Sequence, residues 1–380
     1  MRIAYCLNSI RYLGGIQRVT IVKANALADL PNYEVYIIVT DNKQGVQIAP
    51  LSTKVKLIDL GVNYYEDDWK SKFNVVKGIV LKRREHHKKL KKVLNMIQPD
   101  IVISIGQSEK NIVPSIKGKW KTIREFHFVC NYRILHAQSF FDKILARGGD
   151  FYERFFTLKK YDQIVLLTEE DRETNWKGWK KIVVIPNPKS FTCVKVSSLQ
   201  NPIIVSAGRL NRQKNYKDLI EAFSIVAQKH PEWELEIYGE GEERLMLEEV
   251  IASNHLSNNV FLKGLSTNII DVFCNASVAA FTSISEGFLL SIVEAFECGL
   301  PVISYTCPCG PKEIIEDGVN GFLVPVGDKA LLSKKICELI EHPEMMKQMS
   351  IEAKKRAADY SIKFVIKKWT SLFEELCRLS

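Results

Sequence analysis

The sequence predicts an α/β protein built from two successive, facing Rossmann-like domains, each with a parallel sheet covered by helices. Strand-length apolar segments alternate with amphipathic segments of helix length, and Pro186-Asn187-Pro188 interrupts this alternation once. The 380 residues also exceed what one hydrophobic core usually organises. We therefore expect an interdomain cleft, with ligands at the carboxyl ends of the strands.

The first domain is expected over residues 1–188. Its alternation predicts strands at 3–7, 35–40, 55–60, 101–105, 122–126, 164–168 and 182–185. Helices are expected at 16–30, in the basic stretch after residue 70, and in a region that ends near residue 156.

The second domain is expected over residues 202–358, after a polar, poorly periodic linker at 189–201. The predicted strands are 203–207, 235–238, 260–262, 278–281, 302–304 and 322–324, and the predicted helices are 216–229, 242–252, 291–298 and a short one around Glu313. Residues 359–380 carry apolar side chains at helical spacing. We expect this last helix to pack back on the first domain.

The composition is that of an ordinary soluble protein, with 46% hydrophobic and 26% charged residues. No apolar run approaches the roughly 20 residues of a membrane-spanning helix, and the first ten residues do not resemble a secretory signal. The nine cysteines are an odd number scattered through apolar segments, which favours free thiols. A cytoplasmic location is therefore expected.

The net charge of +9 indicates an anionic partner, and the segment from Lys70 to Lys92 contributes ten of the basic residues. Apolar residues recur there at three- and four-residue steps, so the segment predicts a basic amphipathic helix. Two interpretations stay open: a solvated helix of the first domain, or a peripheral contact with an anionic membrane. No nucleic-acid-binding signature is present, so nucleic acid is not an expected partner.

The segment FTSISEGFLLSIVEAFECGLPVIS, residues 281–304, carries the strongest signal for a site. A buried strand leads to Glu286 and Gly287, and a helix that begins near Leu289 places Glu294 in its second turn. The free N–H groups of a helix start bind phosphate oxygens, and a carboxylate there accepts hydrogen bonds from sugar hydroxyls. The alternative is that Glu294 is a surface residue and Glu286 a helix cap.

A second constellation lies in SAGRLNRQKNYKDLIEAF, residues 206–223. Gly208, Arg209 and Lys214 follow a strand, which places two cations near the carboxyl edge of the sheet. Such cations stabilise the charge that develops on a diphosphate leaving group, so Arg209 and Lys214 are candidate electrophilic catalysts. No Asp-x-Asp metal signature is present, so we expect neither a metal ion nor a cofactor. Gly239 and Gly241 form the matching turn after the next strand, with a plain strand-to-helix turn as the alternative.

In the first domain, Gly14 and Gly15 follow the first strand and leave room for a phosphate or sugar at the next helix start. The pattern is not GxGxxG, so a dehydrogenase is disfavoured.

His127 follows a predicted strand among aromatic residues, where a structural role in the core and a catalytic role are both possible interpretations. The Cys307-Pro-Cys309 pair has no further ligands at metal spacing and predicts a tight loop.

Together, these segments resemble the retaining GT-B glycosyltransferases of family 4 (group 1). The resemblance runs in order through Gly14-Gly15, a mid-domain His, GRL with QKN, YGEGEE, EGF with a downstream Glu, GLPVI and GPKEIIEDGVNGFLVP. It departs from the usual pattern at Leu289, which follows EGF, and at Gln17 in GGIQR.

The resemblance implies roles for individual residues. Gly15, Arg209 and Lys214 would contact the donor diphosphate, and Glu294 would bind the ribose hydroxyls. Glu286 and the backbone of Phe288, Leu289 and Leu290 would meet the sugar and phosphate, and His127 would line the donor-sugar pocket.

The resemblance also implies an activity: metal-independent transfer, with retention, of a hexose or N-acetylhexosamine from a nucleotide diphosphate sugar, most commonly a UDP-sugar. The acceptor would be a glycan or a polyprenyl-diphosphate-linked glycan, as in capsule or lipopolysaccharide O-antigen assembly. The alternatives are a non-catalytic nucleotide-sugar-binding partner subunit and a nucleotide-sugar epimerase of the same fold.

Overall fold

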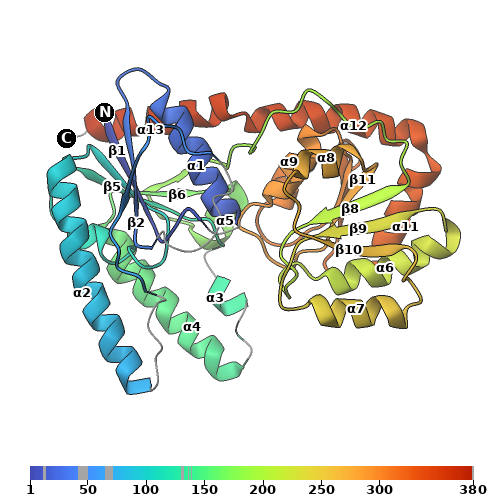
Figure 1. Ribbon diagram of the computed structural model, residues 1–380, viewed down its shortest axis with the longest axis horizontal. Coiled ribbons are helices and arrows are strands. Elements are labelled where there is room, and N and C mark those ends of the chain that lie inside the picture. Colours follow the sequence, from blue (N-terminus) through green and yellow to red (C-terminus); the bar gives the residue numbers. More distant parts are fainter. Residues whose placement is uncertain are drawn as a thin grey trace. The chain divides into compact units, whose positions relative to one another are not determined.

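The computed structural model describes residues 1–11, 14–41, 50–64, 72–129, 132–135, 137 and 139–378 (Figure 1). These residues form two compact units. The first unit contains Met1–Leu167, Arg172–Pro188 and Ile362–Ser380, and the second contains Thr168–Asp171 and Lys189–Ser361. Compared with the expected domains, the second unit also includes a short segment before residue 172, the expected linker, and residues 359–361.

The first unit is built on a parallel sheet of seven strands in the order β3-β2-β1-β4-β5-β6-β7. The strands are β1 (Arg2–Leu7), β2 (Glu34–Val39), β3 (Lys56–Asp59), β4 (Ile101–Ser104), β5 (Lys121–Glu125), β6 (Gln163–Leu166) and β7 (Ile182–Val184). The order reverses between β1 and β4, and the carboxyl ends of strands beside such a reversal flank a crevice suited to ligands.

Helices cover both faces of this sheet, since alternate strand side chains pack with helical side chains in two separate clusters. They are α1 (Gly15–Ala28), α2 (Lys72–Ile97), α3 (Tyr132–Leu135), α4 (Phe140–Tyr152), α5 (Glu169–Asn175, whose first residues belong to the second unit) and α13 (Ile362–Arg378), with a π-helical turn at Glu153–Thr157 and 3₁₀ turns at Val113–Ser115 and Leu158–Lys160. The last helix, α13, joins the core of this unit through Val365, Trp369 and Phe373, which pack with side chains of β1 and α1. Among the described residues, no helix is long and apolar enough to span a bilayer.

The second unit has a parallel sheet of six strands in the order β10-β9-β8-β11-β12-β13. The strands are β8 (Ile203–Ala207), β9 (Glu234–Tyr238), β10 (Val260–Gly264), β11 (Val278–Phe281), β12 (Val302–Tyr305) and β13 (Gly321–Val324). The reversal lies between β8 and β11, so the loops that follow these two neighbouring strands meet at one edge of the sheet.

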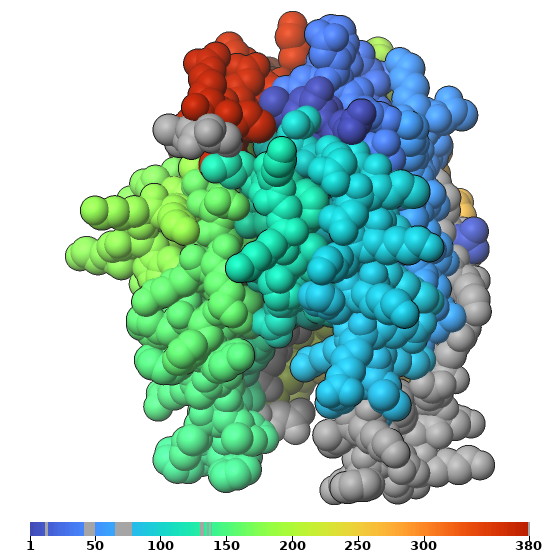
Figure 2. All heavy atoms as spheres, turned by 90° about the vertical axis from the view of Figure 1, so that its left-hand side faces the viewer, coloured from blue at the N-terminus to red at the C-terminus, as the bar shows by residue number. Residues whose placement is uncertain are grey.

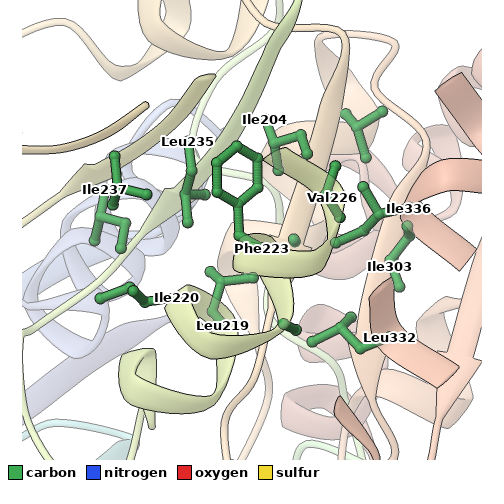
Figure 3. Close-up of a cluster of buried hydrophobic side chains, with 14 of the residues drawn as sticks. Ile204, Leu219, Ile220, Phe223, Val226, Leu235, Ile237, Ile303, Leu332 and Ile336 are labelled. Atoms are coloured by element: carbon green, nitrogen blue, oxygen red, sulfur yellow. The ribbon is translucent and has the colours of Figure 1, made fainter. Parts of the chain in front are cut away.

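The helices of the second unit are α6 (Tyr216–Lys229), α7 (Arg244–Ser253), α8 (Ile269–Cys274), α9 (Leu290–Glu297), α10 (Pro311–Ile314), α11 (Lys329–Glu341) and α12 (Pro343–Ala357), followed by a 3₁₀ turn at Ala358–Tyr360. Figure 3 shows Phe223 of α6 beside Ile204 of β8 and Leu235 of β9, in one buried cluster with Leu332 of α11. The helices α11 and α12 were not among the elements predicted from the sequence.

Candidate functional site

Two loops at the carboxyl end of the second sheet are joined through their backbones. The N–H of Gly208 donates to the carbonyl of Tyr238 at 2.9 Å, and the N–H of Leu210 donates to that of Glu240 at 3.0 Å. A Cβ at Gly239, where φ is +150°, would lie 1.9 Å from the carbonyl oxygen of Gly208. A Cβ at Gly241 would lie 2.2 Å from the carbonyl oxygen of Leu210. Both glycines therefore allow the loops after β8 and β9 to pack together.

The central polar contact of this site joins Lys214 to Glu286. The Lys214 Nζ lies 2.7 Å from Glu286 Oε1, and the two side chains are only 17% and 10% exposed. The loops that carry them are tied together because Gln213 Nε2 donates to the Ser285 carbonyl at 2.7 Å and Ile284 N–H donates to the Gln213 carbonyl at 2.9 Å. The structure thus brings two predicted site residues, 72 positions apart, to the reversal between β8 and β11.

Arg209 occupies the same loop but differs in its surroundings. Its side chain is exposed, and it makes no ion pair or hydrogen bond with any side chain in the described ranges. Arg209 is thus exposed to solvent, as Arg212 of the same loop is, whereas Lys214 is held by a carboxylate. An exposed guanidinium beside a buried ion pair can accept an anion in bidentate geometry without first breaking an internal contact.

The helix α9 begins where the predicted phosphate-binding turn was expected, with Leu289 as its N-cap. No side chain caps it, so Glu286 is not the capping acid. Glu294 is 4% exposed, which rules out the surface interpretation of that residue. The N–H of Leu290 donates to the carbonyl of Phe288 at 2.9 Å, so a ligand would share this donor rather than find it unused.

The predicted tight loop at Cys307–Gly310 lies against this helix start. Cys309 and Gly310 have positive φ values of +64° and +120°. The Pro308 carbonyl accepts from the N–H of Glu286 at 3.3 Å, and a Cβ at Gly310 would lie 3.2 Å from the Leu289 nitrogen. Pro308 and Gly310 were not among the predicted site residues, and no sequence signal places them beside Glu286 and Leu289, because these contacts join distant parts of the chain.

In the first unit, His127 belongs to a buried polar cluster. Its Nε2 lies 3.1 Å from Glu125 Oε1, which also bonds the Lys23 ammonium. Burial acts to raise the pKa of Glu125, but the charges of Lys23 and His127 outweigh it and hold that pKa at about 2. Burial lowers the pKa of Lys23, which Glu125 partly offsets. The Lys23 Nζ also lies 4.6 Å from the centre of the Trp369 ring.

His127 also lines one of two adjoining cavities at the carboxyl end of the first sheet. Its cavity is bordered by Arg124, Arg133 and Glu153 as well. The neighbouring cavity, of about 470 Å³, is lined by Leu7, Asn8, Ile16, Gln17, Ile105, Gly106, Gln107 and Phe128. The two share Ile105, Gln107 and Phe128. His127 is thus both a buried, paired residue and a wall of a cavity.

The predicted glycine pair lies at the start of α1, with Gly14 as its N-cap. A Cβ at Gly15 would meet nothing within 4 Å, while one at Gly14 would lie 2.6 Å from the Gln17 side-chain oxygen. The backbone at Gly15 is therefore open to approach by a ligand.

Most of the second unit matches the model of a known family. Residues 194–356 match the model for glycosyl transferases group 1. An uncharacterized glycosyltransferase of Haemophilus influenzae is 26% identical to this chain, over 98% of this chain and 99% of that relative. The poly(glycerol-phosphate) alpha-glucosyltransferase of Bacillus subtilis is 28% identical to this chain. The match covers 64% of this chain and 37% of that relative.

Among solved structures, the chain is similar to a mutant of Staphylococcus aureus TarM in complex with fondaparinux, alpha-GlcNAc-glycerol and UDP. The TM-score is 0.76 at 16% identity, covering 98% of this chain and 99% of that one. The predicted GT-B fold is confirmed by this similarity and by the two parallel sheets. The chain is therefore similar to glycosyltransferases and matches the group 1 model over residues 194–356, while the roles of its individual site residues stay predictions.

Proposed function

We propose that the chain is a retaining, metal-independent glycosyltransferase that moves a hexose or N-acetylhexosamine from a UDP-sugar to a glycan or lipid-linked acceptor in surface polysaccharide biosynthesis. The observation that carries the proposal is the Lys214–Glu286 pair, held at the sheet reversal beside the open Arg209. Cations in a fixed loop stabilise the negative charge that a diphosphate gains as it leaves.

The donor would occupy this edge of the second sheet. Arg209 and Lys214 would hold the phosphates, and the start of α9 would add backbone N–H groups and the positive end of its dipole. Glu294, which is buried within α9, would bind the ribose hydroxyls, and Glu286 would orient the sugar. Arg209 and Lys214 would balance the charge of the diphosphate, which is why we propose catalysis without a metal ion.

Retention is supported by the names of two relatives. One relative is named an alpha-glucosyltransferase, and the TarM complex contains alpha-GlcNAc-glycerol. Both names refer to α-linked sugars. An α-linked product keeps the configuration of a donor sugar that is α-linked to its diphosphate. We propose that the acceptor attacks on the face the diphosphate leaves, with a diphosphate oxygen taking the acceptor proton.

The acceptor would lie in the adjoining cavities of the first unit. The cavity around Ile16, Ile105 and Phe128 is mainly apolar. The smaller one is polar, with three arginines, of which Arg133 pairs with Asp150 and Glu153. A mixed lining of this kind fits a sugar with an attached lipid or phosphate. The alpha-GlcNAc-glycerol and poly(glycerol-phosphate) in the relatives' names are consistent with such acceptors.

A peripheral membrane contact is proposed on the face of the first unit where α2 and α4 lie (Figure 2). None of the thirteen residues of α4 is buried, and Phe140 and Phe141 are 80% and 67% exposed. The described part of α2 exposes Val80 and Leu81 together with several basic residues, namely Arg83, Arg84, Lys88, Lys91 and Lys92. Aromatic side chains beside basic ones suit an anionic bilayer surface. Lys70 lies outside the described residues.

Flotation with liposomes tests this contact. The chain should float with vesicles that contain phosphatidylglycerol and remain behind with neutral vesicles. Replacing Phe140 and Phe141 by Ser should reduce flotation several-fold, whereas Phe364→Ser, at an exposed phenylalanine on α13, should leave it unchanged. Equal flotation of all three proteins would contradict the contact.

The transfer reaction has two direct tests. The anomeric proton coupling of the product, read by NMR, should show the same configuration as the donor, and an inverted product would refute retention. Excess chelator should leave the transfer rate unchanged, since the proposed ligands of the diphosphate are cationic side chains. Binding of UDP without turnover of any UDP-sugar, with any acceptor, would instead indicate a non-catalytic partner subunit.

A further inference from the structure

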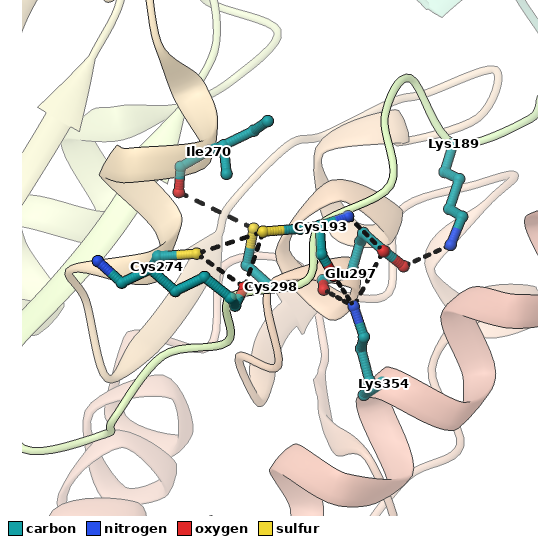
Figure 4. Close-up of polar contacts among 8 residues, drawn as sticks. Lys189, Cys193, Ile270, Cys274, Glu297, Cys298 and Lys354 are labelled. Atoms are coloured by element: carbon teal, nitrogen blue, oxygen red, sulfur yellow. Dashed lines mark hydrogen bonds and ion pairs between the residues drawn. The ribbon is translucent and has the colours of Figure 1, made fainter.

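Three cysteine thiols from distant parts of the sequence converge inside the second unit (Figure 4). The sulfur atoms of Cys193, Cys274 and Cys298 all lie within 4.8 Å of one another, and all three residues are buried. The Cys193 and Cys274 sulfurs are 3.8 Å apart. Both face the Lys195 carbonyl oxygen, at 2.7 and 3.3 Å, and the Cys298 sulfur faces the Ile270 carbonyl at 4.0 Å.

This spacing fits a thiophilic metal ion. Zinc–sulfur bonds of about 2.3 Å at tetrahedral angles place sulfur atoms about 3.8 Å apart. The Cys193–Cys274 distance already has this value, and Cys298 would need to move by no more than about 1 Å to complete the set. Soft thiolates select closed-shell ions such as Zn²⁺ and Cu⁺ over Mg²⁺ and Ca²⁺. The Lys195 carbonyl oxygen lies beside two of the sulfurs and would have to move away from Cys193 Sγ, now 2.7 Å distant, to act as a fourth ligand.

The residues around the thiols hold them in place. Glu297 accepts a hydrogen bond from the backbone N–H of Cys193 at 2.8 Å and bonds Lys189 and Lys354 at 2.6 and 2.9 Å. The Lys354 ammonium also donates to the Cys193 carbonyl at 2.8 Å. Burial raises the pKa of Glu297, but these hydrogen bonds lower it more, so the carboxylate stays ionised. In metal sites, the residues that bind the ion are commonly held in place by hydrogen bonds from residues around them.

We propose that Cys193, Cys274 and Cys298 form a structural binding site for one thiophilic closed-shell ion, Zn²⁺ or Cu⁺. Cys193 lies in the segment that follows the first unit, Cys274 ends α8, and Cys298 is the C-cap of α9. The ion would therefore join that segment to the ends of two helices, one of which begins at the Glu286 loop. This site is separate from the proposed reaction, and its test does not depend on any activity.

The experiment uses the full chain, reduced with a phosphine and freed of metal by dialysis against a chelator. Titration with Cd²⁺ should give a thiolate-to-metal absorption band that saturates at one equivalent. Competition with chromophoric chelators then compares Zn²⁺ with Cu⁺. The tighter ion should raise the unfolding temperature of the protein by about 5 °C at a hundredfold excess over its dissociation constant.

Cys274→Ser should abolish the one-equivalent band, and Cys298→Ser provides a second variant if the first does not fold. Cys337→Ser is the matched control, because Cys337 is also buried in the second unit and lies in a separate group with His230 and Glu341. It should keep the band. The proposal is overturned if wild type gives no saturable band, if Cys274→Ser retains it, or if Cys337→Ser loses it.

Discussion

The ammonium of Lys214 and the carboxylate of Glu286 lie 2.7 Å apart, at the ends of loops that follow adjacent strands of one sheet. Their charges neutralise each other in a largely buried position. A diphosphate that approaches Lys214 would compete with Glu286 for the ammonium and release the carboxylate toward the sugar. Donor binding and sugar orientation would then be coupled through one ion pair.

Lys214→Ala should weaken the binding of UDP by about tenfold to a hundredfold, because one charged contact to phosphate is lost. Glu286→Gln should leave UDP affinity within about threefold and lower the hydrolysis of the UDP-sugar instead. Isothermal titration with UDP measures the first effect. Lys217→Ala, at an exposed lysine on the next turn, is the control and should bind UDP like wild type. Equal losses of UDP affinity in Lys214→Ala and Lys217→Ala would contradict the coupling.

Arg209→Lys should reduce donor turnover by about tenfold or more, although the charge is kept, since a planar guanidinium can hold two phosphate oxygens and an ammonium cannot. Steady-state rates with the UDP-sugar measure this effect. The same change at Arg212, an exposed arginine of the same loop, should alter the rate by less than about twofold. If both variants keep the wild-type rate, Arg209 does not contact the diphosphate.

Gly239→Ala should destabilise the second unit by about 2 kcal/mol or more, because the new Cβ would lie 1.9 Å from the Gly208 carbonyl oxygen. Urea unfolding measures the loss. Gly318→Ala offers the comparison: Gly318 has a φ of +77° but no neighbour within 4 Å, so only the backbone strain of about 1 kcal/mol applies. A Gly239→Ala protein as stable as Gly318→Ala would show that the two loops are not tightly packed.

Lys23→Met should cost about 3–5 kcal/mol of stability, because Glu125 would remain buried without its main partner. The double variant Lys23→Met/Glu125→Leu should recover much of this loss. Thermal unfolding at pH 7 measures both. If the double variant is no more stable than the single one, the pairing of Lys23 with Glu125 does not explain the loss.

The same cluster predicts how stability depends on pH. The pKa of Glu125 falls from its ordinary value of 4.5 to about 2 on folding. Its contribution is therefore fully present above pH 4.5 and is lost as the pH falls toward 2. Between these limits the unfolding free energy should fall by up to about 1.4 kcal/mol per pH unit for this group. Lys23→Met/Glu125→Leu should lack this component, and an unchanged acid slope would contradict it.

The fold followed from the sequence because strand-length apolar runs and amphipathic helical segments alternate clearly over most of the chain. The helices α11 and α12 were not predicted because their many lysines and glutamates obscure the pattern of apolar residues that includes Leu332, Ile336 and Met346. Cap signals were nevertheless present. The Asp328 side chain accepts from Leu331 N–H at the start of α11, and Pro343 opens α12.

The sequence pointed to individual candidate residues of the site, but it did not show which of them contact one another. Lys214 and Glu286 were both identified, yet their pairing depends on β8 lying beside β11, which only the strand order supplies. The thiol cluster had no signal at all: Cys193 and Cys274 are 81 positions apart, and no metal-ligand spacing connects them. Likewise, the close approach that requires Gly239 depends on a loop from another part of the chain.

The most direct test of the account is hydrolysis of donor by the purified chain, measured across a panel of UDP- and GDP-sugars, with Lys214→Ala and Glu294→Ala as variants. We predict turnover of one UDP-sugar, reduced at least a hundredfold by each substitution. Turnover that survives both substitutions, or a chain that neither binds nor hydrolyses any donor, would contradict it.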